Sequence, residues 1–196
     1  MKKTTKMIIS AIAILLVILA IVILISNISN KKPSKAVENF AKELSKGNFT
    51  KAKEYTADDT FAALGIELDS EEIEMIKLYY KNIDVKVTKV NKAKDTAVVT
   101  VEISNKDLGK ILSNYMKKAQ ELALQKVTSK SSVESMEKEL EEYFKSLFEG
   151  DAIETISNSI DVVLTKQDGK WKVIVDDTLR DTLLPGLYSA TNILVA

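Results

Sequence analysis

Cysteine and histidine are absent from this sequence, and arginine and tryptophan occur once each, as Arg180 and Trp171. The missing cysteine and histidine exclude disulfides, thiol nucleophiles, histidine general bases and zinc sites of the usual kind. They also exclude a lipid-modified cysteine in this chain. No glycine-rich loop follows a predicted strand, so nucleotide binding has no support. The sequence therefore predicts no metal ion and no cofactor.

Positive charge is scarce in the main body of the chain. Of the 28 basic residues, five precede Pro33, and the first acidic residue is Glu38. The 23 basic residues after Pro33 face 28 acidic ones, which gives this part a net charge of about −5. Nucleic-acid binders need clustered cations and commonly use arginine. We therefore expect no nucleic-acid partner.

One long apolar run stands out near the amino terminus. Between Met7 and Ile25 the only polar residue is Ser10. Nineteen residues in a helix span roughly 28 Å, close to the apolar thickness of a bilayer. A cleaved secretion signal is the alternative, but its apolar region is usually shorter and ends in an Ala-x-Ala site. The sequence predicts a basic tail at 1–6, a transmembrane helix at 7–26 and a linker at 27–33.

The orientation of this helix follows from its flanks. Three lysines precede the run and three follow it, so the positive-inside rule gives only a slight preference for an inside amino terminus. A short basic tail before an apolar run is also typical of exported proteins. We expect a single-pass protein of the cell membrane with its carboxy-terminal domain outside the cytoplasm.

Residues 34–196 read as one α+β domain. Ser34 is expected to cap a helix whose apolar positions recur every three or four residues until Gly47. Short helices are expected at 49–55 and 73–80. The period then changes from 3.6 to 2, and residues 85–103 predict a β-hairpin with one buried face.

A helical insertion is expected next, at 107–150, where two apolar stripes are separated by a Ser/Thr-rich break. A second hairpin follows, because alternating strands flank the Asp-Gly turn at 168–169. The end of the chain reads as a short helix broken at Pro185-Gly186. The predicted fold is thus an N-terminal transmembrane helix followed by a curved antiparallel sheet packed with helices, with a long helical insertion between two β-hairpins.

Three short segments resemble the NTF2-like superfamily of cone-shaped α+β domains. They are Gly-Asn-Phe-Thr-Lys-Ala at 47–52, the Val-rich hairpin at 85–101, and Lys-Gln-Asp-Gly-Lys-Trp-Lys-Val at 166–173. The resemblance covers most of 34–177 and points in particular to membrane-anchored bacterial members classed as domains of unknown function. It implies a curved sheet wrapped by helices, in some members around a ligand cavity. The insertion at 107–150 is longer than the family pattern.

Several residues are candidates for a ligand site, each with a structural alternative. Tyr79 and Tyr80 could offer hydroxyls to a ligand, or one could lie in the core and the other at its rim. Trp171 could line a pocket or fill the core. Asp176, with Asp177, could lie at the mouth of a cone or cap the helix that follows.

Two acidic segments have similar alternatives. Asp58-Asp59 could act in proton transfer or cation binding, or could cap a helix. The glutamate-rich run at 134–142 reads as a solvated helix face that could also meet a basic partner. No catalytic residue is predicted from any of these features.

The sequence favours a non-enzymatic binding or accessory module of the bacterial cell envelope, tethered to the bilayer through residues 7–26. Its partner would be an envelope protein, a cell-wall component or a small ligand. One alternative is an enzyme with Asp and Tyr as acid and base, which would require Asp58, Asp84 or Asp176 to be buried and unpaired. Another is an anchored sensor or immunity protein that binds a partner through 107–150.

Overall fold

The structure is a computed structural model that describes residues 32–66, 73–128, 133–150 and 153–187. The predicted transmembrane helix at 7–26 lies outside these residues. None of the helices within the described ranges is long and apolar enough to cross a bilayer. The elements, in chain order, are α2 (Pro33–Ser45), α3 (Phe49–Lys53), η1 (Phe61–Leu64), α4 (Ile73–Lys81), β1 (Asp84–Lys92), β2 (Thr96–Lys106), α5 (Leu108–Thr128), α6 (Val133–Glu149), β3 (Thr155–Gln167), β4 (Lys170–Val173) and α7 (Asp177–Leu183).

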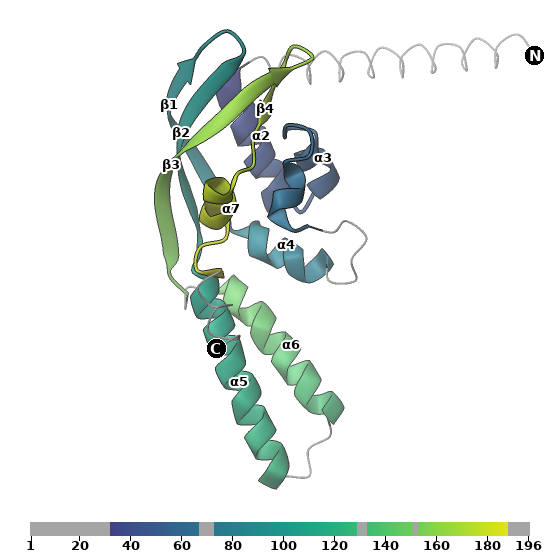
Figure 1. Cartoon of the computed structure of the whole chain (residues 1–196). Helices are drawn as coiled ribbons and strands as arrows, with labels where there is room; N and C mark the ends of the chain where they lie inside the picture. Colours follow the sequence, from purple (N-terminus) through teal and green to yellow (C-terminus); the bar gives the residue numbers. More distant parts are fainter. Residues whose placement is uncertain (1–31, 67–72, 129–132, 151–152, 188–196) are drawn as a thin grey trace, which may run out of the picture.

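Four antiparallel strands form one sheet in the order β1-β2-β3-β4. The two predicted hairpins, β1-β2 and β3-β4, are its two halves, and β2 pairs with β3 along its whole length from Thr96 to Lys106. Figure 1 shows the strands curving around α2. Asp168 and Gly169 both have positive φ, 48° and 76°, as the Asp-Gly turn of the second hairpin requires. The predicted α+β class with an antiparallel sheet is confirmed.

The helix α2 packs its apolar stripe on the inner face of the sheet and fills the space around which the sheet curves. Its buried side chains meet inward-facing residues of β2, β3 and β4 in one hydrophobic core. The members of this core that are least exposed include Phe40, Leu44, Val99, Val101, Ile103, Val162, Leu164 and Trp171. The sheet's concave side is therefore occupied by protein side chains along α2.

The carboxy-terminal end of α2 is as predicted, and its amino-terminal end is not. Gly47 has φ +70°, and the amides of Gly47 and Asn48 donate to the carbonyls of Leu44 and Glu43 at 2.9 Å each. This is the Schellman pattern that favours glycine after a helix. The expected Ser34 cap is wrong: the helix begins with Pro33 in its first turn, and Lys32 is the N-cap residue without a side-chain bond. Proline's fixed φ suits that first position.

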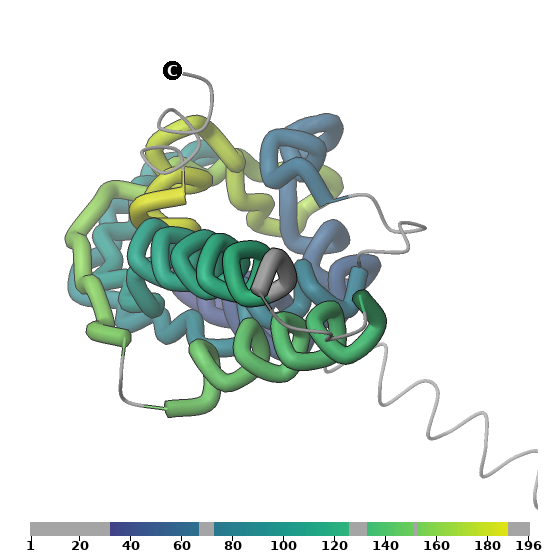
Figure 2. The backbone as a smooth tube through the Cα atoms, turned by 90° about the horizontal axis from the view of Figure 1, so that it is seen from below, coloured from purple at the N-terminus to yellow at the C-terminus, as the bar shows by residue number. Residues whose placement is uncertain are grey.

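The helices α5 and α6 form a hairpin that extends from one end of the sheet, away from α2 (Figure 1). Seen from below, the two helices lie side by side in front of the body (Figure 2). Leu108 and Ile111 at the base of α5 are fully buried, whereas Leu124 in its distal part is 71% exposed. The hairpin is therefore joined to the core mainly through its base.

Candidate functional site

The four residues predicted as a ligand site come from three parts of the fold, which are α4, β4 and the start of α7. Tyr80 is 1% exposed, and its ring centroid lies 5.7 Å from that of Phe49 in an edge-on contact. Tyr79, its neighbour on α4, is half-buried at the edge of the core. The expectation that one tyrosine is in the core and the other at its rim is confirmed.

Trp171 fills the core and Asp176 caps a helix, which are the structural roles that the sequence gave as alternatives to ligand binding. Trp171 is 1% exposed within the core, and Lys92 Nζ lies 5.6 Å from its ring centroid. Asp176 is the N-cap of α7, where its carboxylate accepts a hydrogen bond of 2.8 Å from the Leu179 amide. None of the three cavities described below is lined by any of the four residues. Ligand binding by them stays a prediction.

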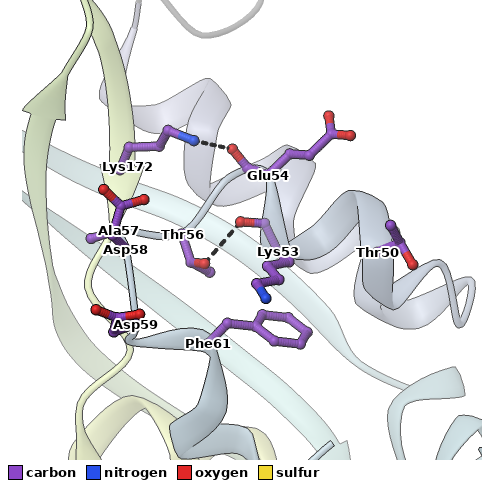
Figure 3. Close-up of a pocket in the computed structure, with 9 residues that line it drawn as sticks. All are labelled: Thr50, Lys53, Glu54, Thr56, Ala57, Asp58, Asp59, Phe61 and Lys172. Atoms are coloured by element: carbon purple, nitrogen blue, oxygen red, sulfur yellow. Dashed lines mark hydrogen bonds between the residues drawn. The ribbon is translucent and has the colours of Figure 1, made fainter. Parts of the chain in front are cut away.

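A first cavity, of about 480 Å³, lies between α3, η1 and β4 (Figure 3). The loop before η1 is held on β4 because the Ala57 amide donates to the Val173 carbonyl and the Val173 amide donates to the Tyr55 carbonyl, each at 2.8 Å. Lys172 Nζ donates to the carbonyl of Glu54 across this junction. The cavity is lined by Thr50, Lys53, Glu54, Thr56, Ala57, Asp58, Asp59, Phe61 and Lys172.

The adjacent residues Asp58 and Asp59 both line this cavity, and both are exposed. Their predicted capping role is wrong, because η1 follows Thr60 and has no side-chain cap. Asp59 instead has φ +64° in the preceding turn, a conformation that aspartate tolerates better than most residues. With Lys53 and Lys172 opposite, the cavity presents both signs of charge.

Tyr55, next to the same junction, has a hydroxyl pKa that is shifted from its usual value. Partial burial raises the pKa of its hydroxyl, and the nearby carboxylates of Glu43 and Glu54 raise it further. Its phenol is therefore protonated at neutral pH.

The acid–base chemistry of the enzyme alternative finds no support in the described residues. Asp58, Asp84 and Asp176 are all exposed. The only buried polar or charged residues in the described ranges are Thr56, Asn105 and Lys106, none of which is an acid. Within the same ranges no three acidic side chains gather closely enough to hold a metal ion.

A second and more apolar hollow lies between α4 and α6. It consists of two adjoining cavities of about 240 and 530 Å³ that share Met75, Glu141 and Phe144. We call it the α4–α6 groove. Its full lining is Glu74, Met75, Leu78, Tyr115, Glu137, Leu140, Glu141, Phe144, Lys145 and Glu149.

Aromatic rings form the floor of the α4–α6 groove. The ring of Phe144 lies 5.1 Å from Tyr115, 5.2 Å from Phe148 and 6.3 Å from Tyr79, each edge-on. Edge-on pairs at such distances are favourable and hold the rings in place. The ring of Tyr79, one of the predicted site residues, thus packs against the aromatic floor of the groove.

Four glutamates and one lysine surround this apolar floor. Glu74 pairs with Lys77 and Glu141 with Lys145, both at 2.5 Å. Hydrogen bonding from Lys145, together with its charge, lowers the pKa of the Glu141 carboxyl below its usual value. The same contact raises the pKa of Lys145. Both groups are charged at neutral pH.

Two buried residues at the end of β2, Asn105 and Lys106, bind the ends of neighbouring helices next to the base of the α5–α6 hairpin. Asn105 is 1% exposed; its Nδ2 donates to the carbonyls of Tyr79 at 3.0 Å and Leu183 at 2.8 Å, and its Oδ1 accepts from the Lys106 amide at 2.8 Å. Lys106 Nζ donates to the carbonyl of Gly150. An asparagine next to a lysine at the end of a strand carries no signal of this role.

Comparisons with known proteins leave the family open. No protein-family model matches the chain, and no curated protein sequence matches it either. Among solved structures, one similar chain is YcdA, a candidate lipoprotein of Bacillus subtilis subsp. subtilis str. 168, with a TM-score of 0.45 and 16% identity over 78% of this chain. The chain spans 57% of the length of that protein.

Another similar chain is a candidate dehydratase of the NTF2-like family from Streptomyces avermitilis. It has a TM-score of 0.30 and 15% identity, over 73% of this chain and 94% of that one. At this level of similarity the α+β fold stands on the strand order and pairing described above. The resemblance to the NTF2-like superfamily stays a prediction.

Proposed function

We propose that this chain is a membrane-tethered, extracytoplasmic accessory module of the bacterial cell envelope that binds a partner protein through its α5–α6 hairpin. The observation that carries this proposal is the α4–α6 groove, an apolar hollow with charged side chains at its rim. Exposed apolar patches on soluble domains mark interaction sites. The apolar run of residues 7–26 supports the tether.

The structure favours partner binding over the enzyme alternative for a specific reason. An enzyme of the expected type needs a desolvated acid or base in an enclosed pocket. None of the described carboxylates is buried, and the concave side of the sheet along α2 is filled by the core. The groove, in contrast, has α6 as one wall, and α6 belongs to the segment 107–150 that the sequence offered as a partner-binding segment.

The tether is tested by fractionation of cells that make the full-length chain. We expect the chain to sediment with membranes and to stay there after alkaline carbonate washing. Protease added to intact spheroplasts should digest the domain. A full-length, uncut chain that remains in the supernatant would contradict the tether, and protection of the domain until lysis would reverse its orientation.

Partner binding is tested by photo-crosslinking in the same membranes. A photoreactive phenylalanine analogue is placed at Met75, in the groove, and in a control chain at Leu124, on the distal part of α5. We expect a discrete crosslinked product from position 75 and none from position 124. Equal products from both positions, or none from either, would contradict binding at the groove.

A further inference from the structure

The α4–α6 groove has the length of a short helix. Along α6 it extends from Glu137 to Glu149. Twelve residue steps at a rise of 1.5 Å amount to about 18 Å, or a little more than three helical turns. The wall opposite is α4, of nine residues. An occupant that fills this hollow is therefore an elongated element of about 12 residues.

Both walls of the groove are helices, and this decides the conformation of the occupant. Helices satisfy their own backbone hydrogen bonds, so neither wall offers a row of free amides and carbonyls to an extended chain. A bound strand would leave its backbone groups unpaired against an apolar floor, which is unfavourable. A helix satisfies its backbone internally and can place one apolar face on the floor.

The floor suits an apolar helix face. Met75 is 45% exposed, and its flexible thioether adapts to different side chains. Leu78, Tyr115 and Leu140 are half-buried beside it. Binding there removes apolar surface from water, which is the main driving force for helix-in-groove recognition.

The rim sets the charge of the occupant. Glu74 is on one wall and Glu137, Glu141 and Glu149 are on the other, against the single rim cation Lys145. Glu137 and Glu149 form no ion pair with any described residue. Glu74 and Glu141 are paired only with exposed lysines of their own helices, and such pairs are weak enough to exchange partners. The rim therefore attracts cations.

From this combination we infer that the α4–α6 groove binds a basic amphipathic helix of a partner protein, with its apolar stripe on Met75 and Phe144 and its lysine or arginine side chains on the rim glutamates. This inference rests on the proposed function and specifies its partner. A second copy of this chain fits less well, because a two-fold interface would place the same glutamates opposite one another. An anionic lipid surface is repelled by the same rim.

The test uses the full-length chain in nanodiscs of zwitterionic lipid and a fluorescent 18-residue model peptide of leucine and lysine with an apolar helical stripe. Binding is measured by fluorescence anisotropy, with empty nanodiscs subtracted. We expect saturable binding, weakened by salt. A peptide with glutamate in place of every lysine, and a lysine peptide with its leucines scattered around the helix, should bind at least about tenfold more weakly.

Two matched pairs of variants locate the binding. Met75→Lys places a charge on the floor and Leu124→Lys places the same charge on an exposed apolar position outside the groove. Glu137→Lys reverses a rim charge and Glu134→Lys reverses an exposed charge one turn earlier on α6. We expect a loss of roughly tenfold or more in affinity from each groove variant and less than about threefold from its partner.

Each outcome decides the inference. Equal losses within the pairs, or equal binding of the glutamate peptide, would overturn it. A groove-dependent dimer of the chain in sedimentation, abolished by Met75→Lys, would assign the groove to a second copy and also overturn it. If position 75 crosslinks a partner in cells while the lysine peptide fails to bind, the chemistry of the occupant is wrong and partner binding survives. If both fail, the proposed function fails as well.

Discussion

The sheet with α2 and the α5–α6 hairpin are built on different principles. In the sheet and α2, residues far apart in sequence meet in a dry core, and Leu44, Val99 and Leu164 have no exposed surface. The hairpin is largely local helix, and most of its distal described side chains face solvent. The body therefore gains its stability from long-range burial, and the hairpin depends on its junction with the body. A surface for partners is better placed on the second kind of structure, because its exposed side chains can change without loss of the core.

The largest expected effect comes from the core of the body. Replacing Trp171 by alanine removes a fully buried ring next to α2 and should lower the free energy of unfolding by about 3–5 kcal/mol. Urea unfolding followed by circular dichroism measures it. The matched change in the hairpin, Leu124→Ala, should stay within about 0.5 kcal/mol of the parent. Similar losses from the two variants would show that the hairpin and the body are not distinct in this way.

The second effect concerns the junction. Asn105→Ala leaves the carbonyls of Tyr79 and Leu183 and the amide of Lys106 without their side-chain partner. Buried groups left unsatisfied cost about 1–3 kcal/mol each, so we expect a total loss of at least about 3 kcal/mol. The exposed Asn158 on β3 provides the control, since Asn158→Ala should change little. Hydrogen exchange should also show faster opening at the base of α5 in the Asn105 variant.

A smaller effect is expected at a close backbone contact in the same junction. A Cβ atom on Gly109 would lie 2.8 Å from the carbonyl oxygen of Gly186, where backbone cannot move aside cheaply. Gly109→Ala should therefore destabilise by about 1–3 kcal/mol through overpacking. Ser113→Ala, one turn later on an exposed face of α5, is its control in the same thermal unfolding measurement. An unchanged stability in the Gly109 variant would show that the base of the hairpin tolerates displacement.

The smallest effect is the pH response of the hairpin surface. The pKa of Glu141 is lowered by Lys145, so its contribution to stability is present above the usual carboxyl pKa and is lost as the pH falls through the lowered value. Lys145 stays charged throughout this range because its own pKa is raised. Glu141→Gln should therefore reduce the melting temperature slightly at pH 7, and the reduction should disappear as the pH falls through the lowered pKa. Glu137→Gln, which removes no ion pair, should show no such difference.

Local patterns predicted most of the individual elements. The alternation of Val85 and Val87, the Asp-Gly turn at 168–169 and the glycine after α2 each depend on neighbours in the chain, and the structure has the expected strands, turn and helix end. The helix starts were less predictable. Ser34 and Asp58-Asp59 are good capping residues by type, yet Pro33 and the turn at Asp59 determine those starts.

Sequence patterns predicted only part of the candidate site. The acidic run on α6 reads from the sequence as a surface that could meet a basic partner, and two of its glutamates, Glu137 and Glu141, line the groove. The role of Tyr79 as a ligand contact stays a prediction, and its ring packs edge-on against Phe144 and Phe148 of the aromatic floor. Met75 was not singled out, because a methionine in an amphipathic helix is typical of a core position.

The sequence by itself determined the composition limits, the apolar run at 7–25 and the periods of the strands and helices, because each depends on residue type and on spacings within one element. Tertiary structure decided which faces became core and which stayed open. The groove joins α4 to a helix about 60 residues later in the chain. Such a meeting is set by the path of the sheet and by the buried Asn105 junction, and no pattern within either helix specifies it.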